Sequence, residues 1–571
     1  MLPERPEAAP AHGTAPPATR SGGDGRQAAG PPPDAMPLAP AGSRDPGFHD
    51  LSATRVVAAG LLLSKPTGYL RDALLASRFG TGAAMGAYTL ASTACTAVFD
   101  VIGTPLTRVA VPVLVAARRR RGVAGLSRTA MAILWTEAAL AVLAALILLV
   151  LAGPVAGLLA GAAGPSRAEA ATLLRWLALL PLAMVLSAYA TAWLQASERF
   201  TLPAFTGLPL DFAIIGFVLF AHRHGILAAA WGLLLGTFAQ YALQWPGLRR
   251  WGHRIAAPAP AAALRDPGLG ATARMALPLL GSAGAIECVN LLQQALAARL
   301  PGGAVAAFGY AYRVLDLPSA LLILPVTAVV LPRLAAFAAM GQEDVGAGFF
   351  AEATWALAAG LLPCALLIGG LAQPLAAALY EHGAFGPHSV HEMGACLVGF
   401  APGVLAYGIQ QMLRARFYAR QDARTPLAWD AASLATTAAF DLVAYRTLGD
   451  LGLALGWSAG SAVAWWGMAR TVRRSRSAAG AAPGAVPSRP APGPYLVALA
   501  VAGAALAILL ALLPAHVPPW LGHRAWRVGL AQVLAVGAAG SALYVVVLGL
   551  AGGRPLLQGL AGHVRRRTPE K

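Results

Sequence analysis

Long runs of apolar residues alternate with short polar segments along most of the chain. A helix of about 20 residues rises about 30 Å, which is the thickness of a bilayer's hydrocarbon core. Backbone polar groups in lipid must be paired within their own segment, so apolar runs of this length predict helices. Several runs contain no charged residue over 18 or more positions: Trp176–Trp193, Ile226–Leu248, Ala353–Tyr380, Gly394–Leu413, Leu451–Ala469 and Val528–Gly553. With the less clean runs included, the pattern predicts about fourteen spans, centred near residues 65, 100, 142, 184, 212, 237, 286, 320, 362, 403, 435, 460, 504 and 540.

Composition supports a membrane class. Hydrophobic residues make up 57% of the 571 residues and charged residues only 12%, against about 25% charged in soluble domains. So few charges could not cover the surface of a soluble protein of this length, which excludes a soluble enzyme. The expected fold is therefore an all-α polytopic membrane protein. The four cysteines are isolated in apolar stretches, so no metal site or disulfide framework is expected.

The positive charge gathers in particular loops. The formal net charge is +18, and most Lys and Arg residues lie in loops after even-numbered spans or at the C-terminus, as in the run from Arg118 to Arg121. This is the positive-inside pattern, and it predicts that both termini are cytoplasmic. Because cytoplasmic loops account for most of the net positive charge, we expect no nucleic-acid partner.

An internal repeat appears at an offset of about 220 residues. The segment "VAVPVLVAA" at 109–117 is similar to "VVLPRLAAF" at 329–337, and "QASERFTLPAF" at 195–205 is similar to "FYARQDARTPLAW" at 417–429. Six helices is an even number, so two such halves enter the membrane from the same side and form parallel repeats. The sequence predicts a first half at 51–250, a second half at 272–473 and a terminal helix pair at 495–553.

The remaining segments are polar or rich in proline. Residues 1–50 hold 11 prolines, so we expect a disordered cytoplasmic tail. A cytoplasmic linker at 251–271, a Pro/Ala-rich linker at 474–494 and a basic cytoplasmic C-terminus at 554–571 complete the expected organisation.

Ionisable residues inside the predicted spans are candidates for function, because burying a charge in a bilayer is costly. The first span carries Lys65, Arg71 and Asp72 within "SKPTGYLRDALLASRFG". Lys65 and Arg71 are six residues apart, about 240° around a straight helix, and a break at Pro66 would bring both toward one cavity. Later spans add Asp100, Asp211, Glu287, Arg313 and Asp316 as cavity-lining or coupling candidates.

Structural explanations for these residues stay open at this stage. Arg71 and Asp72 form an interfacial pair in one interpretation, and Arg313 and Asp316, three residues apart, neutralise each other in another. Glu287 serves as a hydrogen-bonded residue between helices in a third interpretation. His382, His388 and His391 cluster with two glutamates, but the spacing is loose and we expect no metal there.

The chain shows no nucleotide-binding loop of the form GxxxxGK[ST] and no recognisable catalytic triad. We therefore expect a transporter rather than an enzyme, with no cofactor. Its energy would come from the membrane potential, a monovalent ion gradient or the gradient of its substrate.

Several segments resemble the MurJ/MviN lipid II flippases of the MOP exporter superfamily. They are "SKPTGYLRDALLASRFGTG", "SERFTLPAF", "LYEHGAFG" and above all "YRVLDLPSA" and "FYARQDARTP". The resemblance runs from about Leu51 to the end of the chain. It implies fourteen helices in two lobes plus a terminal pair, and translocation of an undecaprenyl-diphosphate-linked muropeptide across the bacterial cytoplasmic membrane.

The resemblance also implies a cationic central cavity in which Lys65, Arg71 and Arg313 hold the lipid diphosphate. An acid that the family carries early in the second helix falls at Gly86 here, and Asp100 stands near the position of expected basic residues. Transport of another polyprenyl-linked glycan, drug or cation export of the MATE type, and a non-transporting scaffold for cell-wall synthesis proteins therefore remain alternatives. We expect a monomer, with a polyprenyl-diphosphate glycolipid and membrane lipid as partners.

Overall fold

The computed structural model describes residues 51–160, 167–250, 266–478, 492–513 and 525–556, together with residue 558. The expected tail at 1–50 lies outside the described residues, as do 251–265 and 479–491 of the two linkers and nearly all of the basic C-terminus. The described residues form helices and no β-strand, which confirms the all-α fold. In chain order the elements are α1 (Leu51–Phe79), α2 (Ala83–Ala160), α3 (Arg167–Leu177), α4 (Leu180–Ala196), α5 (Thr201–Ala204), α6 (Gly207–Phe220), η1 (His222–His224), α7 (Ile226–Arg250), α9 (Pro267–Ala297), α10 (Ala304–Pro318), η2 (Ser319–Ile323), α11 (Leu324–Ala339), α12 (Glu343–Gly370), α13 (Ala372–Tyr380), α14 (Pro387–Ala419), α15 (Arg424–Ala478), α16 (Pro492–Leu512), α17 (Ala525–Leu548) and η4 (Gly549–Gly553).

Two of these helices are too long to be single spans. At 1.5 Å per residue the 78 residues of α2 would extend about 117 Å, nearly four times the hydrocarbon thickness. The backbone leaves helical geometry at Gly122, where φ is 65°, and in α15 at Gly449, where φ is 56°. Residues that carry a side chain rarely adopt these left-handed backbone angles. A glycine therefore marks the point where each helix turns back.

The described part of the chain contains eight helices that are long and apolar enough to cross a membrane, or nine if one bent pair is counted as a span. Because α2 is counted once although Gly122 divides it, these numbers do not fix the span count. The figure of fourteen stays a prediction, whereas the polytopic helical character is established.

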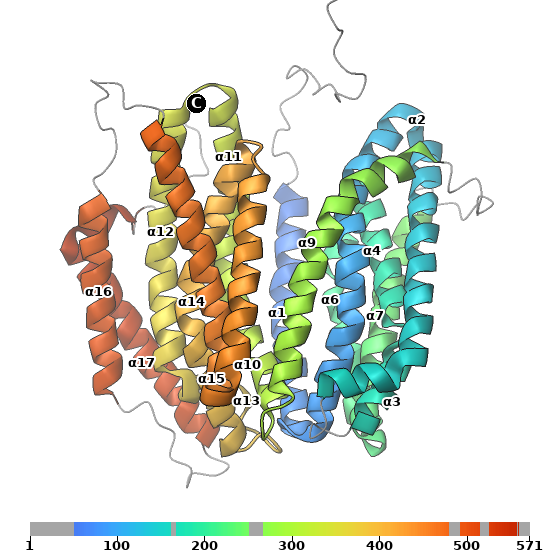
Figure 1. Ribbon diagram of the computed structural model, residues 1–571, viewed down its shortest axis with the longest axis horizontal. Helices are drawn as coiled ribbons and strands as arrows, with labels where there is room; N and C mark the ends of the chain where they lie inside the picture. Colours follow the sequence, from blue (N-terminus) through green and yellow to red (C-terminus); the bar gives the residue numbers. More distant parts are fainter. Residues whose placement is uncertain are drawn as a thin grey trace, which may run out of the picture. The chain divides into compact units, whose positions relative to one another are not determined.

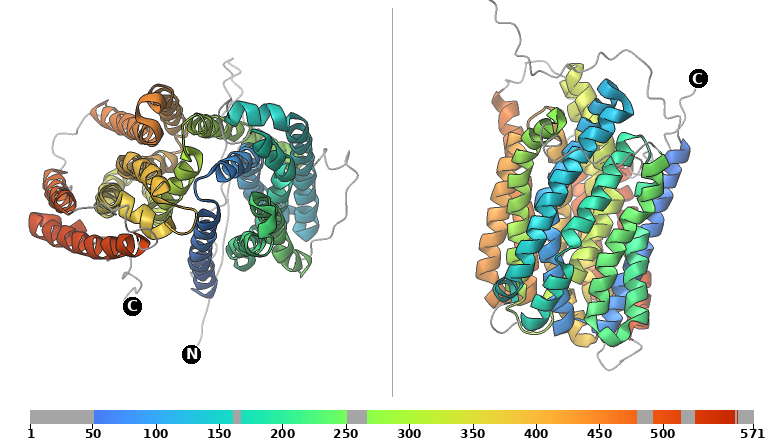
Figure 2. Two further views of the ribbon diagram at one scale, coloured as in Figure 1. Left: turned by 90° about the horizontal axis from the view of Figure 1, so that it is seen from below. Right: turned by 90° about the vertical axis from the view of Figure 1, so that its right-hand side faces the viewer.

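The helices pack in two groups (Figures 1 and 2). In the first group α2 packs against α3 and α4, and α6 packs against α7; in the second, α14 packs against α10, α12 and α15. Helix α9 contacts both α2 and α15, so the helix that opens the predicted second half bridges the two groups. Helices α16 and α17 pack against each other and against α12 and α13.

The interior of the bundle combines many small residues with a few large ones such as Trp193. The interior is rich in alanine, including Ala76, Ala87 and Ala91 with no accessible surface. Small residues let helix backbones approach closely, which is how helices associate in lipid. Large apolar side chains such as Val150 and Phe220 are exposed by 79% and 87%. Such exposure suits contact with acyl chains rather than with water.

The two groups are joined at the end where α1 meets α2. The Ala384 N–H donates to the Ser77 carbonyl oxygen over 2.7 Å, and the Thr81 and Ser389 hydroxyls lie 2.7 Å apart. We call these four residues the end junction. It ties the first helical hairpin to the loop before α14 and to the first turn of α14 itself.

Candidate functional site

Arg71 projects from α1 into a network of carboxylates. Its Nε lies 2.8 Å from Asp72 Oδ1, and its Nη1 lies 2.8 Å from Asp211 Oδ1 on α6. The Thr67 hydroxyl donates to the other Asp211 oxygen over 3.0 Å. Thr67 and Arg71 are four residues apart, so they share a face of α1. This face fixes the guanidinium between two acids.

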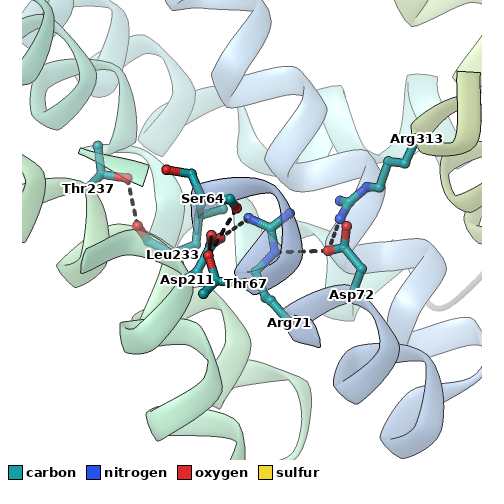
Figure 3. A network of polar contacts seen from close by, with 8 residues as sticks. All are labelled: Ser64, Thr67, Arg71, Asp72, Asp211, Leu233, Thr237 and Arg313. Carbon is teal, nitrogen blue, oxygen red and sulfur yellow. Dashed lines mark hydrogen bonds and ion pairs between the residues drawn. The ribbon is translucent and has the colours of Figure 1, made fainter. Parts of the chain in front are cut away.

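Arg313 reaches the same network from α10 in the second group. It forms an ion pair with Asp72 Oδ1, and the Tyr69 hydroxyl donates to its backbone oxygen over 3.1 Å. Asp72 is buried, with 3% of its surface accessible. Figure 3 shows Arg71 and Arg313 converging on this one carboxylate. Through Asp211, Arg71 ties α1 to α6 of the first group, and Asp72 joins this arginine to Arg313 of the second group.

A cavity of about 330 Å³ opens in front of the two arginines. Its lining residues come from α1, α2, α6, α7, α9 and α10: Arg71, Leu75, Tyr88, Ser92, Thr93, Thr96, Ala97, Asp100, Ile214, Leu233, Glu287, Asn290 and Arg313. Four of the residues singled out in the sequence thus share one wall, although they lie on four different helices.

The wall of this cavity carries both signs of charge. Asp100 accepts a hydrogen bond from Thr104 over 3.0 Å, and Glu287 accepts one from Asn290 over 3.2 Å. Neither acid forms an ion pair within the described part of the chain. The two arginines are therefore balanced in number by two carboxylates, and the cavity is not uniformly cationic as the family resemblance implied.

Lys65 and Asp316 lie away from this wall. Helix α1 continues through Pro66, so the expected break is wrong and Lys65 keeps its offset of about 240° from Arg71. Lys65 is exposed and does not line the 330 Å³ cavity. Asp316 lines a different cavity of about 220 Å³. Arg313 pairs with Asp72, so the alternative interpretation in which Arg313 and Asp316 form a pair is not the arrangement found.

Several buried residues were not anticipated from the sequence. Glu137 is 2% exposed, and its Oε1 has no hydrogen-bond partner in the described part of the chain. Asp441 has no accessible surface. Each is a single acid in a predicted span, which is the signal that selected Asp100 and Asp211, so both could have been found. Thr67 and Tyr69 carry no such signal, because their roles depend on contacts across helices.

No group of three or more His, Cys, Asp or Glu side chains is placed to hold a metal ion anywhere in the described ranges. In the histidine cluster of the sequence, His388 lies 3.2 Å from Glu392. Glu392 also accepts the backbone N–H of Gly303 over 3.0 Å, at the start of α10. Its carboxylate therefore serves as a cap for that helix.

Comparison with solved structures defines the class of fold. The chain matches the lipid II flippase MurJ in its inward closed conformation with a TM-score of 0.71 and 16% identity, covering 87% of this chain and 98% of that one. It matches an inward-facing multidrug resistance MATE family transporter of the MOP superfamily with a TM-score of 0.60 and 16% identity, covering 74% and 99%. The fold is that of a multi-pass membrane transporter of this superfamily.

Sequence comparison gives the family. The lipid II flippase MurJ family model matches residues 75–523, so the chain belongs to the MurJ family. The lipid II flippase MurJ of Burkholderia cenocepacia is 29% identical over 283 residues, which is 48% of this chain and 54% of that protein. The probable lipid II flippase MurJ of Rhizobium meliloti is 28% identical over 280 residues, 48% and 51% of the two chains. The chain thus spans about half the length of the curated relatives it matches.

Proposed function

We propose that this protein is a flippase that moves an undecaprenyl-diphosphate-linked cell-wall precursor, lipid II, from the inner to the outer leaflet of the bacterial cytoplasmic membrane. The observation that carries the proposal is the convergence of Arg71 and Arg313, from the two helix groups, on one carboxylate beside a 330 Å³ cavity. Family membership supports the choice of cargo.

Arginine suits a diphosphate because its planar guanidinium offers paired donors to phosphate oxygens. A diphosphate carries about two negative charges and cannot enter hydrocarbon without replacing its lost hydration. In the structure both guanidinium groups are held by Asp72, and Arg71 also by Asp211. An entering diphosphate competes with these carboxylates, so binding rearranges the link between the two helix groups. Such a rearrangement is the kind of differential contact that alternating access requires.

The proposal includes the setting of the protein. It is a multi-pass protein of the inner membrane that acts as a monomer with both termini in the cytoplasm, and it transports without catalysing a covalent reaction. The membrane potential or a monovalent ion supplies the energy. The isoprenoid tail stays in lipid while the head group passes between the helix groups, and cell-wall synthesis proteins are partners.

Asp100 and Glu287 favour one second candidate, export of organic cations. Two carboxylates on the wall of the same cavity would attract a cationic drug as effectively as the arginines attract an anion. An anionic cargo requires the arginines of the cavity wall, whereas a cationic cargo requires its carboxylates. Variants of the two kinds of residue therefore distinguish the two candidate functions.

The test is complementation after depletion of the protein, with lipid analysis of the two leaflets. We expect R71A and R313A to leave lipid II in the inner leaflet, and R446A, an exposed arginine outside the cavity, to support growth. Purified R71K and R313K keep the charge and should bind undecaprenyl diphosphate about 10- to 100-fold more weakly than wild type, since a bidentate charged contact is lost. Full flipping by the R71A R313A double variant would refute the proposal. Loss of cation efflux in D100N E287Q with lipid flipping intact would favour the second candidate.

A further inference from the structure

Asp316 carries a charge that the proposed diphosphate site does not use. Its carboxylate takes part in none of the hydrogen bonds or ion pairs found within the described part of the chain, and the residue is exposed. Arg313, three residues earlier, lies about 60° away around α10 and faces Asp72 instead. No ion pair joins Asp316 to Lys65 or to Arg313 in the described part of the chain. A charge left without a partner inside a membrane protein is a candidate for ligand binding.

The cavity that Asp316 lines has three aromatic residues in its wall, together with aliphatic residues, Ser319 and Gln411. Its volume is about 220 Å³, and its lining includes Tyr312, Tyr407 and Trp457. Tyr312 and Asp316 are four residues apart and share a face of α10. The Tyr407 and Trp457 rings lie 5.6 Å apart, from α14 and α15. Three aromatic residues around one carboxylate suit an organic ammonium group, because a cation is attracted to the ring faces and to the acid at once.

The volume of this cavity suits part of a ligand rather than a whole drug-sized molecule. A cavity for a drug-sized ligand has about 300–1,000 Å³, whereas a single water takes about 30 Å³. A space of about 220 Å³ fits an aminoalkyl side chain. This cavity and the diphosphate cavity both border α10, through Asp316 and Arg313. A molecule with its phosphate at one place and its amine at the other would occupy both.

We propose that the cavity lined by Tyr312, Asp316, Tyr407 and Trp457 is a subsite for an ammonium group on the head group of the lipid-linked substrate. The inference rests on the proposed function and adds a recognition element for the amine-bearing part of the cargo. The carboxylate pairs with the ammonium, and the rings replace its hydration.

The decisive measurement compares two cargo lipids on the purified full chain. One is undecaprenyl-diphosphate muropeptide with a free side-chain amine, and the other is the same lipid acetylated on that amine. Wild type should bind the free-amine form about tenfold more tightly, as a desolvated cation–π contact with an ion pair implies. D316N should bind both forms equally and match wild type for the acetylated form. D316E and the control E352Q, an exposed acid on α12, should keep the preference, and W457L should reduce it.

The outcomes separate the subsite from the proposed function. Equal binding of both lipids by wild type overturns the subsite and leaves the flippase proposal intact. A preference that survives in D316N also overturns it. If neither lipid binds, the proposed function fails, and the subsite is judged by thermal shift with n-hexylammonium against n-hexanol. There the ammonium should raise Tm in wild type and E352Q but not in D316N, and equal shifts in wild type and D316N would refute the subsite.

Discussion

At the scale of residues, Asp72 is the side chain on which the site depends. It is buried and pairs with both Arg71 and Arg313. The sequence drew attention to these charges because each is costly inside a bilayer. It could not show that one carboxylate serves two arginines 242 positions apart in the chain, because that pairing exists only when α1 and α10 meet.

Replacing Asp72 with asparagine should destabilise the fold strongly. The change leaves two cations without their shared anion, and breaking a buried pair costs roughly 3–5 kcal/mol. Thermal unfolding in detergent should show a clear fall in Tm. The matched control is E343Q, whose partner is Arg420 and whose side chain is 66% exposed, with an expected loss of at most about 1 kcal/mol. Equal Tm values for D72N and E343Q would contradict the role given to Asp72.

Removing an acid from the cavity wall should strengthen anion binding, whereas removing one of the arginines should weaken it. In D100N or E287Q one negative charge disappears from the wall that the arginines share. A unit charge about 7 Å away at an effective dielectric near 20 contributes about 2.4 kcal/mol, which is roughly 50-fold in anion affinity. We expect tighter binding of undecaprenyl diphosphate by each variant, measured on purified protein. Weaker binding would mean that the acids hold the arginines in place.

At the scale of elements, glycines decide where the long helices reverse. Hydropathy and charge predict that the chain turns between the spans near residues 100 and 142 and between those near 435 and 460, but they do not identify the residue at which the backbone reverses. Gly122 and Gly449 adopt left-handed backbone angles, and both have free space where a side chain would stand. A side chain at either position would therefore cost energy through backbone strain rather than through a steric clash.

The variant G449A tests this interpretation. A side chain at a positive φ costs about 1–2 kcal/mol, so G449A should lower the Tm. The control is G537A in α17, where φ is not positive and nothing lies within 4 Å. That change should be neutral or stabilise the helix by about 0.5–1 kcal/mol, since alanine is a better helix former. A stabilising effect of G449A would show that the turn does not need glycine.

At the scale of the whole molecule, the end junction holds the two helix groups together at one end. The contacts of Ser77 with Ala384 and of Thr81 with Ser389 link segments more than 300 residues apart in the chain. Transport by alternating access requires such contacts to open during the cycle. One contact is a hydrogen bond between two backbone groups and the other joins two hydroxyls, and such uncharged hydrogen bonds suit a contact that must break repeatedly.

Locking this junction should stop transport. The double variant T81C S389C places two thiols where hydroxyl oxygens lie 2.7 Å apart, a separation that permits a disulfide after small rotations. In a background with exposed Cys288 replaced by serine, oxidation should abolish lipid flipping and reduction should restore it. T81C alone should flip in both conditions. Flipping by the oxidised, cross-linked protein would show that the junction stays closed throughout the cycle.

The sequence alone determined the class of molecule, because the length and spacing of apolar runs are dictated by bilayer thickness and by the cost of unpaired backbone in lipid. The motifs "YRVLDLPSA" and "FYARQDARTP" indicated the family, and family membership was then shown for residues 75–523. The isolated charges were visible as candidates for the same energetic reason.

Only the tertiary structure decided which of those charged residues line the same cavity and which lie apart. Around α10, a separation of about 60° sends Arg313 to Asp72 and leaves Asp316 facing aromatic rings in a second cavity, and the unbroken α1 keeps Lys65 away from the wall that Arg71 lines. Asp100 and Glu287 reach that wall from α2 and α9. Electrostatic partners are chosen by distance in space, and side chains on different helices acquire such distances only when the helices pack.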